Sequence, residues 1–192
     1  GVLMDIIYTE IKLFSDVEDQ HEQLWSITKN VAWVINEKWM TPDKGIWEFR
    51  GEDQHFTFSK VLCWVAIDRA IKVAELFKKG KKIKKWILLR DSIKKDILSK
   101  GWNKNKRAFT QSYNSSDLDA SVLLMEPYGF ISANDPKYIS TVHAIEKELS
   151  NDGLLYRYKN EDDFGLPSSS FTVCTFWFID ALNKIGEREK AK

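Results

Sequence analysis

Apolar residues recur at helical spacing along most of this chain, and long irregular stretches interrupt that pattern. Such a period places apolar side chains on one face of a helix. No alternating pattern of apolar and polar residues is long enough to demand a sheet. The sequence therefore predicts an all-α fold, with helices over residues 2–13, 18–39, 56–77, 83–98, 136–149 and 171–185.

Local signals give some of the helix ends. Gly80 lies between two helices that are expected to pack as an antiparallel pair. Asn134 or Asp135 can cap the helix in which Pro136 occupies the first turn. The helix over residues 171–185 is apolar on nearly every side in its first half, so we expect it to be buried.

Three long loops separate the predicted helices, and a short helix is expected after the second loop, over residues 117–125. Loops longer than about 12–15 residues within a compact domain are uncommon and usually functional. These loops carry many of the aromatic, acidic and arginine side chains, and they cover residues 40–55, 102–116 and 150–170. The pattern predicts a pocket formed by loops at one end of a helical framework.

Length and charge limit the function classes. A chain of 192 residues fits one domain of ordinary size. Its 29 basic and 28 acidic residues give a net charge of +1, which provides no general attraction to nucleic acid or to an anionic membrane. No uninterrupted apolar run is long enough for a membrane span, and the amino end lacks the pattern of a secretion signal. We therefore expect a cytoplasmic protein with no nucleic-acid or membrane partner, and homo-oligomer formation stays open.

Two features leave alternatives of other kinds. Residues 78–107 are basic and could bind an anion, but the lysines fall mostly opposite an apolar helix face, which favours a solvated surface. Cys63 and Cys174 lie in apolar, aromatic runs and are expected to pack in the core of a protein from a reducing compartment. Neither the cysteines nor the three scattered histidines have the spacing of a metal site, so no metal is expected.

Glu48 is the strongest candidate for catalysis. It lies between Trp47 and Phe49, and a carboxyl group that packs against apolar rings is desolvated. Desolvation raises the pKa of a carboxyl group toward the range useful for a general acid. The alternative is a surface glutamate that pairs with Arg50.

Several aromatic side chains on the loops could bind sugar rings. Trp47, Trp102, Tyr156 and Tyr158 offer flat apolar faces, and Arg50 and Arg157 could donate hydrogen bonds to hydroxyl groups. Each of these aromatic residues, taken singly, is more often part of a core.

The motifs resemble those of glycoside hydrolase family fifteen, the glucoamylase-like enzymes of bacteria and archaea. The resemblance begins with Pro-Asp-Lys-Gly-Ile-Trp-Glu-Phe-Arg-Gly at residues 42–51. It covers nearly the whole chain, because further segments follow in the same order: residues 55–60, 63–70, 101–102, 109–111, 118–121, 135–136, 141–145, 153–158 and 174–177.

The resemblance implies part of an (α/α)6 toroid, with a pocket among the loops at one end. It also implies an inverting, exo-acting α-glucosidase of the glucoamylase type that needs no metal or organic cofactor. Trehalose hydrolysis is the close alternative within the same family. By matched position Glu48 is the general acid, Trp47 lines the pocket, and Arg157 binds substrate; Arg50 is a candidate by adjacency.

The same resemblance leaves part of the machinery without a match. Inversion requires a second, ionised carboxylate that activates water. Nothing in the sequence matches the segment that carries the general base in the family, and Asp162 and Asp163 fall at a different motif. Residues 1–192 are therefore expected to be an incomplete fragment of a catalytic domain. A noncatalytic carbohydrate-binding module is the remaining alternative.

Overall fold

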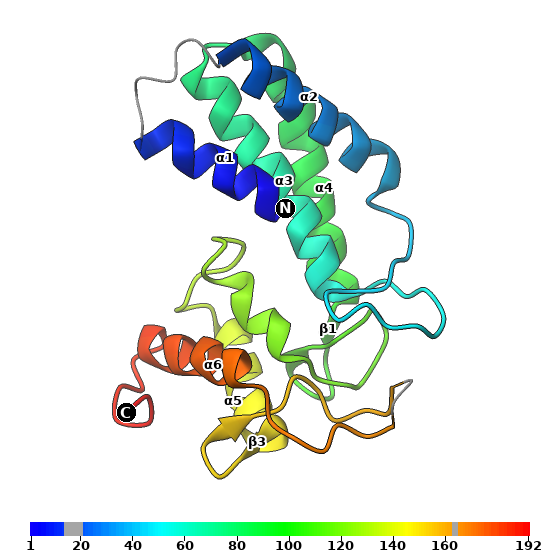
Figure 1. Ribbon diagram of the computed structural model, residues 1–192, viewed down its shortest axis with the longest axis vertical. Coiled ribbons are helices and arrows are strands. Elements are labelled where there is room, and N and C mark those ends of the chain that lie inside the picture. Colours follow the sequence, from blue (N-terminus) through cyan, green and yellow to red (C-terminus); the bar gives the residue numbers. More distant parts are fainter. Residues whose placement is uncertain (14–20, 163–164) are drawn as a thin grey trace. The chain divides into compact units, whose positions relative to one another are not determined.

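The computed structural model describes residues 1–13, 21–162 and 165–192, and the predicted all-α class is confirmed (Figure 1). Its α-helices are α1 (Val2–Leu13), α2 (His21–Lys38), α3 (Thr57–Leu76), α4 (Ile83–Lys100), α5 (Pro136–Leu149) and α6 (Thr172–Lys184). Within the described ranges, the 3-10 helices η2 (Gly80–Lys82) and η3 (Ala120–Met125) lie between them. The strands have two residues each and form two antiparallel hairpins, β1 (Trp102–Asn103) with β2 (Ala108–Phe109) and β3 (Ser150–Asn151) with β4 (Leu154–Leu155).

The chain divides into two compact units. The first consists of residues 1–41 and 60–96, and the second of residues 42–59 and 97–192. The first unit contains α1, α2, and most of α3 and α4. The second contains both hairpins, η3, α5 and α6, together with every residue that the sequence analysis proposed for the site.

Helices α3 and α4 of the first unit run antiparallel, as the sequence predicted. Lys94 Nζ lies 5.3 Å from the ring centroid of Trp64, and Arg90 Nη1 lies 3.7 Å from Asp68 Oδ1. The residue numbers rise on one helix as they fall on the other, which establishes the direction. Helix α3 is apolar enough to be buried over most of its length, and its fully buried residues include Val61, Val65, Ala66, Ile67, Ala70, Val73 and Ala74.

In the second unit, α5 packs against η3 and β2. The Tyr138 hydroxyl donates to the Leu123 carbonyl oxygen at 2.8 Å, and the Phe109 N–H donates to Thr141 Oγ1 at 3.0 Å. These side chains are all buried. The start of α5 follows from its sequence, since Pro136 is in the first turn and the Asp135 carboxylate accepts the Lys137 N–H at 2.8 Å.

The structure refines two sequence expectations, and part of a third lies where the structure does not describe the chain. The helix expected over residues 117–125 is a 3-10 helix that begins at Ala120, because the Asp119 carboxylate holds the Ser121 N–H and fixes the entry to the turn. Of the two predicted caps for α5, Asp135 is the one that caps it. The expected start of the second helix, residues 18–20, lies outside the described residues.

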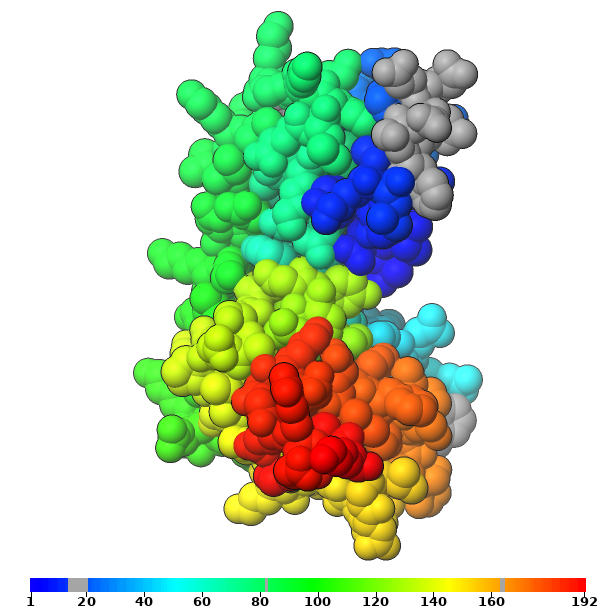
Figure 2. Space-filling view, turned by 90° about the vertical axis from the view of Figure 1, so that its left-hand side faces the viewer, coloured from blue at the N-terminus to red at the C-terminus, as the bar shows by residue number. Residues whose placement is uncertain are grey.

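The expectation that α6 is buried on nearly every side is wrong for the described unit. Cys174, Phe178 and Leu182 are buried, but Phe176 is 64% exposed and Ile179 is 37% exposed. The remaining residues of the unit cover one face of the helix only. The segment from α6 to the carboxyl end, orange to red in Figure 2, lies on the surface of this unit.

Among the described helices, none is both long and apolar enough to cross a membrane.

Replacement of the α5 cap tests the assignment of the helix start. Asp135→Ala removes the acceptor for the Lys137 N–H and is expected to lower the free energy of unfolding by about 1 kcal/mol. Urea denaturation measures the change. Asn134→Ala, at the neighbouring predicted cap, is the matched control and is expected to leave stability nearly unchanged. An equal loss in both variants would contradict the assignment.

Candidate active site

A closed loop carries the Trp47–Phe49 segment. Asp43 and Gln54 exchange backbone hydrogen bonds of 2.8 and 2.9 Å and so close the loop. The Asp43 carboxylate accepts the Gly45 N–H at 2.7 Å and the Ser59 hydroxyl at 2.6 Å, and Ser59 belongs to α3. Both ends of the loop are therefore held at the start of that helix.

Glu48 lies at the tip of this loop in a strained conformation. Its φ is 54°, in the left-handed region that costs an ordinary residue roughly 1–2 kcal/mol. Its side chain is exposed, which agrees with the surface position that the sequence analysis kept as the alternative to packing of the carboxyl group against the neighbouring rings. The reason is the backbone turn, which directs the side chains of Trp47 and Phe49 inward and leaves the carboxyl group in solvent.

The two flanking rings belong to one aromatic cluster. The Trp47 ring centroid lies 5.9 Å from Phe171, 6.2 Å from Trp177 and 6.4 Å from Tyr158. Phe49 stacks on Phe56 at 5.2 Å and contacts Tyr158 at 5.0 Å. The sequence analysis proposed Trp47 and Tyr158 for the site, and the structure brings these two together.

Phe171 and Trp177 are cluster members that the sequence analysis missed. Phe171 is the residue before α6 and Trp177 lies within that helix, more than a hundred residues after Trp47. Nothing in the local pattern connects them to the loop, because an apolar helix start is typical of any core helix. Only the tertiary fold identifies them as neighbours of the site.

Asp119 is the third residue missed. Its side chain is buried, with 2% of the residue exposed. Its Oδ2 accepts Trp47 Nε1–H at 2.8 Å and the Gln111 amide at 3.1 Å, and its Oδ1 accepts the Ser121 N–H at 2.8 Å. Burial raises the pKa of this carboxyl group, and the hydrogen bonds from these donors oppose the shift.

Arg157 is held beside the cluster by Asp162. Its Nη2 lies 3.1 Å from Asp162 Oδ2, and its guanidinium carbon lies 4.9 Å from the Tyr158 ring centroid. The Tyr158 hydroxyl donates to the same carboxylate oxygen. Burial, with the hydrogen bond to Asp162, raises the Tyr158 pKa to about 12. Arg157 Nε is buried and has no hydrogen-bond partner among the described residues.

The remaining predicted residues have other surroundings. Arg50 is exposed on the Glu48 loop. Trp102, in β1, packs edge-on against Phe109 at 5.2 Å and lies under Lys137 Nζ at 5.1 Å. These contacts share no residue with the Trp47 cluster, so a role for Trp102 in the site stays a prediction. Asp163 lies outside the described residues.

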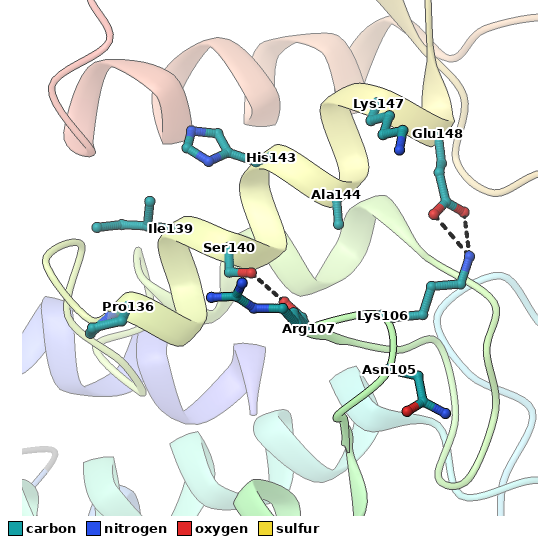
Figure 3. Close-up of a pocket in the computed structure, with 10 residues that line it drawn as sticks. All are labelled: Asn105, Lys106, Arg107, Pro136, Ile139, Ser140, His143, Ala144, Lys147 and Glu148. Carbon is teal, nitrogen blue, oxygen red and sulfur yellow. Dashed lines mark hydrogen bonds and ion pairs between the residues drawn. The ribbon is translucent and has the colours of Figure 1, made fainter.

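A groove on α5 offers a different surface (Figure 3). Its volume is about 650 Å³, and charged residues are among those that line it. Lys106 Nζ contacts both carboxylate oxygens of Glu148, at 2.8 and 2.7 Å, and the Ser140 hydroxyl donates to the Arg107 carbonyl oxygen. None of the residues that the sequence analysis proposed for catalysis or sugar binding lines this groove, although Lys106 and Arg107 belong to the basic stretch over residues 78–107.

Two further kinds of site, a metal centre and a thiol nucleophile, concern the described histidine, cysteine and acidic residues. In the part of the chain that the structure describes, no three histidine, cysteine or acidic residues are grouped so that they could hold a metal ion. Cys174 is buried, and desolvation raises its thiol pKa to about 12, so it is a core residue rather than a nucleophile.

Comparison with known proteins places this geometry in context. A family model described as glycosyl hydrolases family 15 matches residues 2–191. The trehalase of Mycolicibacterium smegmatis is 42% identical over 195 residues, which covers 100% of this chain and 29% of that protein. The trehalase of Thermoplasma volcanium is 39% identical over 170 residues, which covers 88% of this chain and 27% of that protein. Trehalase 1 of Sulfolobus acidocaldarius is 33% identical over 192 residues, which covers 100% of this chain and 32% of that protein. The chain thus spans about a third or less of the length of these relatives.

Solved structures show the same fold. A glycosidase with one substitution, in complex with glucose, matches with a TM-score of 0.69 and 15% identity, over 83% of this chain and 41% of that chain. The wild-type glycosidase gives the same values. At this level of identity the likeness concerns the fold alone.

Replacement of Gly45 tests whether close packing shapes the Glu48 loop. Gly45 has φ +69°, and an added Cβ would lie 2.9 Å from Phe56 Cγ, whereas Gly153 has φ +77° and open space around it. Gly153→Ala is therefore the control for backbone strain alone, which costs about 1–2 kcal/mol. Gly45→Ala is expected to cost roughly 1–3 kcal/mol more in urea denaturation, because the ring must move. Equal costs would show that Phe56 does not constrain the loop.

Proposed function

The chain belongs to glycosyl hydrolase family 15, and from this membership we propose that the protein containing it hydrolyses α-glucosides with inversion, with α,α-trehalose as its substrate. The observation that carries the proposal is the exposed Glu48 carboxyl group between two rings of a fixed aromatic cluster. The choice of trehalose rests on the relatives, which are 33–43% identical to the chain and are all named trehalase. They favour this substrate over the glucoamylase-type substrates that the sequence analysis put first.

Glu48 is proposed as the general acid. In its protonated form it gives its proton to the glycosidic oxygen as the bond to the attacked glucose breaks. Its exposed position leaves room for a substrate oxygen to approach the carboxyl group. The reaction needs no metal or organic cofactor, because protonation and activation of water supply the chemistry.

The general base must be another carboxylate, about 6.5–9.5 Å from the acid. Asp119 does not fit this role, because it is buried and its oxygens already accept the three N–H donors. Asp162 accepts hydrogen bonds from Arg157 and Tyr158. The base segment of the family has no match in this sequence, so we propose that a part of the protein outside residues 1–192 supplies the base.

Substrate binding is proposed for the residues around Glu48. Trp47 offers an aromatic face next to the acid, and Arg157 has a buried Nε–H without a partner among the described residues. A guanidinium group that Asp162 holds in place can donate hydrogen bonds to sugar hydroxyls. Arg50 and Trp102 are further candidates.

Two other functions remain as competing outcomes. A glucoamylase-type enzyme would release glucose from longer α-glucans. A protein without a general base would bind carbohydrate and would not catalyse its hydrolysis. Both would use the same aromatic cluster.

Initial rates on three substrates test the substrate assignment. We expect the full-length protein to hydrolyse trehalose at least about tenfold faster, in kcat/KM, than maltose or maltotriose, which is a difference of about 1.4 kcal/mol in transition-state binding. A coupled assay for glucose measures the rates. Faster hydrolysis of maltotriose supports the glucoamylase-type reading, and binding without glucose release supports the carbohydrate-binding reading.

Glu48→Gln tests the acid, since the amide cannot donate a carboxylic proton. We expect kcat on trehalose to fall by at least about 100-fold, which is the lower end of the usual contribution of general acid catalysis. Glu52→Gln, at an exposed position on the same loop, is the matched control and is expected to keep wild-type activity. Proton NMR of the first product reports stereochemistry. Inversion gives α- and β-glucose in equal amounts from trehalose, whereas α-glucose alone would contradict it.

A further inference from the structure

We propose that Asp119 is a positioning residue for Glu48: it holds the Trp47 indole by a buried hydrogen bond and thereby fixes the direction of the neighbouring carboxyl group. The bond joins Trp47 Nε1 and Asp119 Oδ2 at 2.8 Å. The inference rests on the proposed function, because it assigns Asp119 a part in the same reaction. It adds a residue that acts through Trp47 and touches neither the substrate nor the water.

The donors around Asp119 match an ionised carboxylate. Trp47 Nε1 and the Ser121 backbone nitrogen can only donate, and the Gln111 amide nitrogen donates as well. Hydrogen bonds to an ionised group are roughly twice as strong as those between neutral groups. Since Asp119 is 2% exposed, water does not compete for these donors. A strong, oriented hydrogen bond therefore fixes the edge of the Trp47 ring.

Asp119 is itself fixed to segments that do not belong to the Glu48 loop. Its carboxylate caps η3 through the Ser121 N–H, and the N–H of the next residue, Ala120, donates to the Arg157 carbonyl oxygen at 2.8 Å. Gln111 in turn accepts the Thr57 N–H at its backbone oxygen at 2.8 Å. Asp119, which holds Trp47, is thus part of the same hydrogen-bonded segment that positions the backbone of Arg157, the proposed substrate-binding residue.

The strained backbone of Glu48 explains why an anchor is required. A left-handed residue persists only where its surroundings hold it, and relaxation at φ 54° would turn the side chain away. Stacking on Phe56 restrains Phe49 after Glu48, and the Asp119 bond restrains Trp47 before it. Stacking alone lets a ring slide within its plane, whereas a hydrogen bond at the ring edge fixes its rotation.

Asp119→Asn in the full-length protein breaks this bond selectively. Asparagine is as good a cap as aspartate, so its one carbonyl oxygen can still accept the Ser121 N–H. Its NH2 group then takes the place of Oδ2. That group is a donor, so it cannot accept the hydrogen bonds from Trp47 Nε1–H and the Gln111 amide. Trp47→Phe removes the same bond from the other side and keeps an aromatic ring. Gln111→Met is the matched control, because it removes the other donor to Oδ2 and leaves the Trp47 bond.

A pair of substrates separates a positioning role from a merely structural one. Trehalose needs a proton on the departing oxygen, whereas α-glucosyl fluoride releases fluoride with little help from an acid. We expect Asp119→Asn to lower kcat on trehalose by about 10- to 100-fold, the usual effect of a misplaced group, with KM changed less than about threefold. On α-glucosyl fluoride the expected loss is below about threefold. Gln111→Met is expected to stay within about threefold of wild type on both substrates.

Each outcome of the two-substrate assay either supports or overturns the positioning role of Asp119. Equal losses on both substrates, or unchanged activity on trehalose, overturn the inference. If Asp119→Asn does not fold, Trp47→Phe carries the same substrate test, and equal losses there overturn it. The double variant with both Asp119→Asn and Trp47→Phe should be about as slow as the slower of the two single variants. All three variants lack the same hydrogen bond between residues 47 and 119. A wild-type protein that hydrolyses neither substrate refutes the proposed function itself and is distinguishable from these results.

Discussion

One buried carboxylate joins the segments from which the candidate site is built. Asp119 accepts hydrogen bonds from the Trp47 side chain, from Gln111 and from the first turn of η3. A buried carboxylate is costly, and the same burial raises the pKa of the Asp119 carboxyl group. The charge is tolerated because donors from three parts of the chain surround it, and in return these parts are fixed to one another. The loop with Glu48 owes its place in the second unit to this arrangement and to the aromatic cluster.

In this loop, two residues are held in place by packing, and the residue between them is accessible to a substrate. Trp47 and Phe49 point into packed surroundings, while Glu48 between them is exposed in a left-handed turn. A general acid must keep its direction without the help of packing on its own side chain, since the substrate must reach it. The surrounding framework supplies that direction through the two flanking rings. On this account, catalytic competence depends on contacts several residues away from the acid.

Much of the framework could be predicted from the sequence. The apolar period located the helices, and Pro136 with its preceding carboxylate marked the start of α5. The Gly-Ile-Trp-Glu motif led to Glu48 through its resemblance to a family. The sequence left open whether Glu48 packs against its neighbours or lies at the surface, because its exposure follows from a left-handed backbone that a run of aromatic neighbours does not reveal. Asp119, Phe171 and Trp177 were missed for a related reason: their link to the loop exists only after distant segments pack together.

The central claim is that Glu48 donates the proton to the glycosidic oxygen of an α-glucoside. The most direct measurement is a crystal structure of the full-length Glu48→Gln protein with trehalose bound. The account predicts that the side-chain amide of residue 48 lies within hydrogen-bond reach of the glycosidic oxygen, at about 2.6–3.2 Å, with the Trp47 ring beside the bound sugar. A bound trehalose whose glycosidic oxygen contacts another carboxyl group, or which lies away from the Trp47 cluster, would contradict the account.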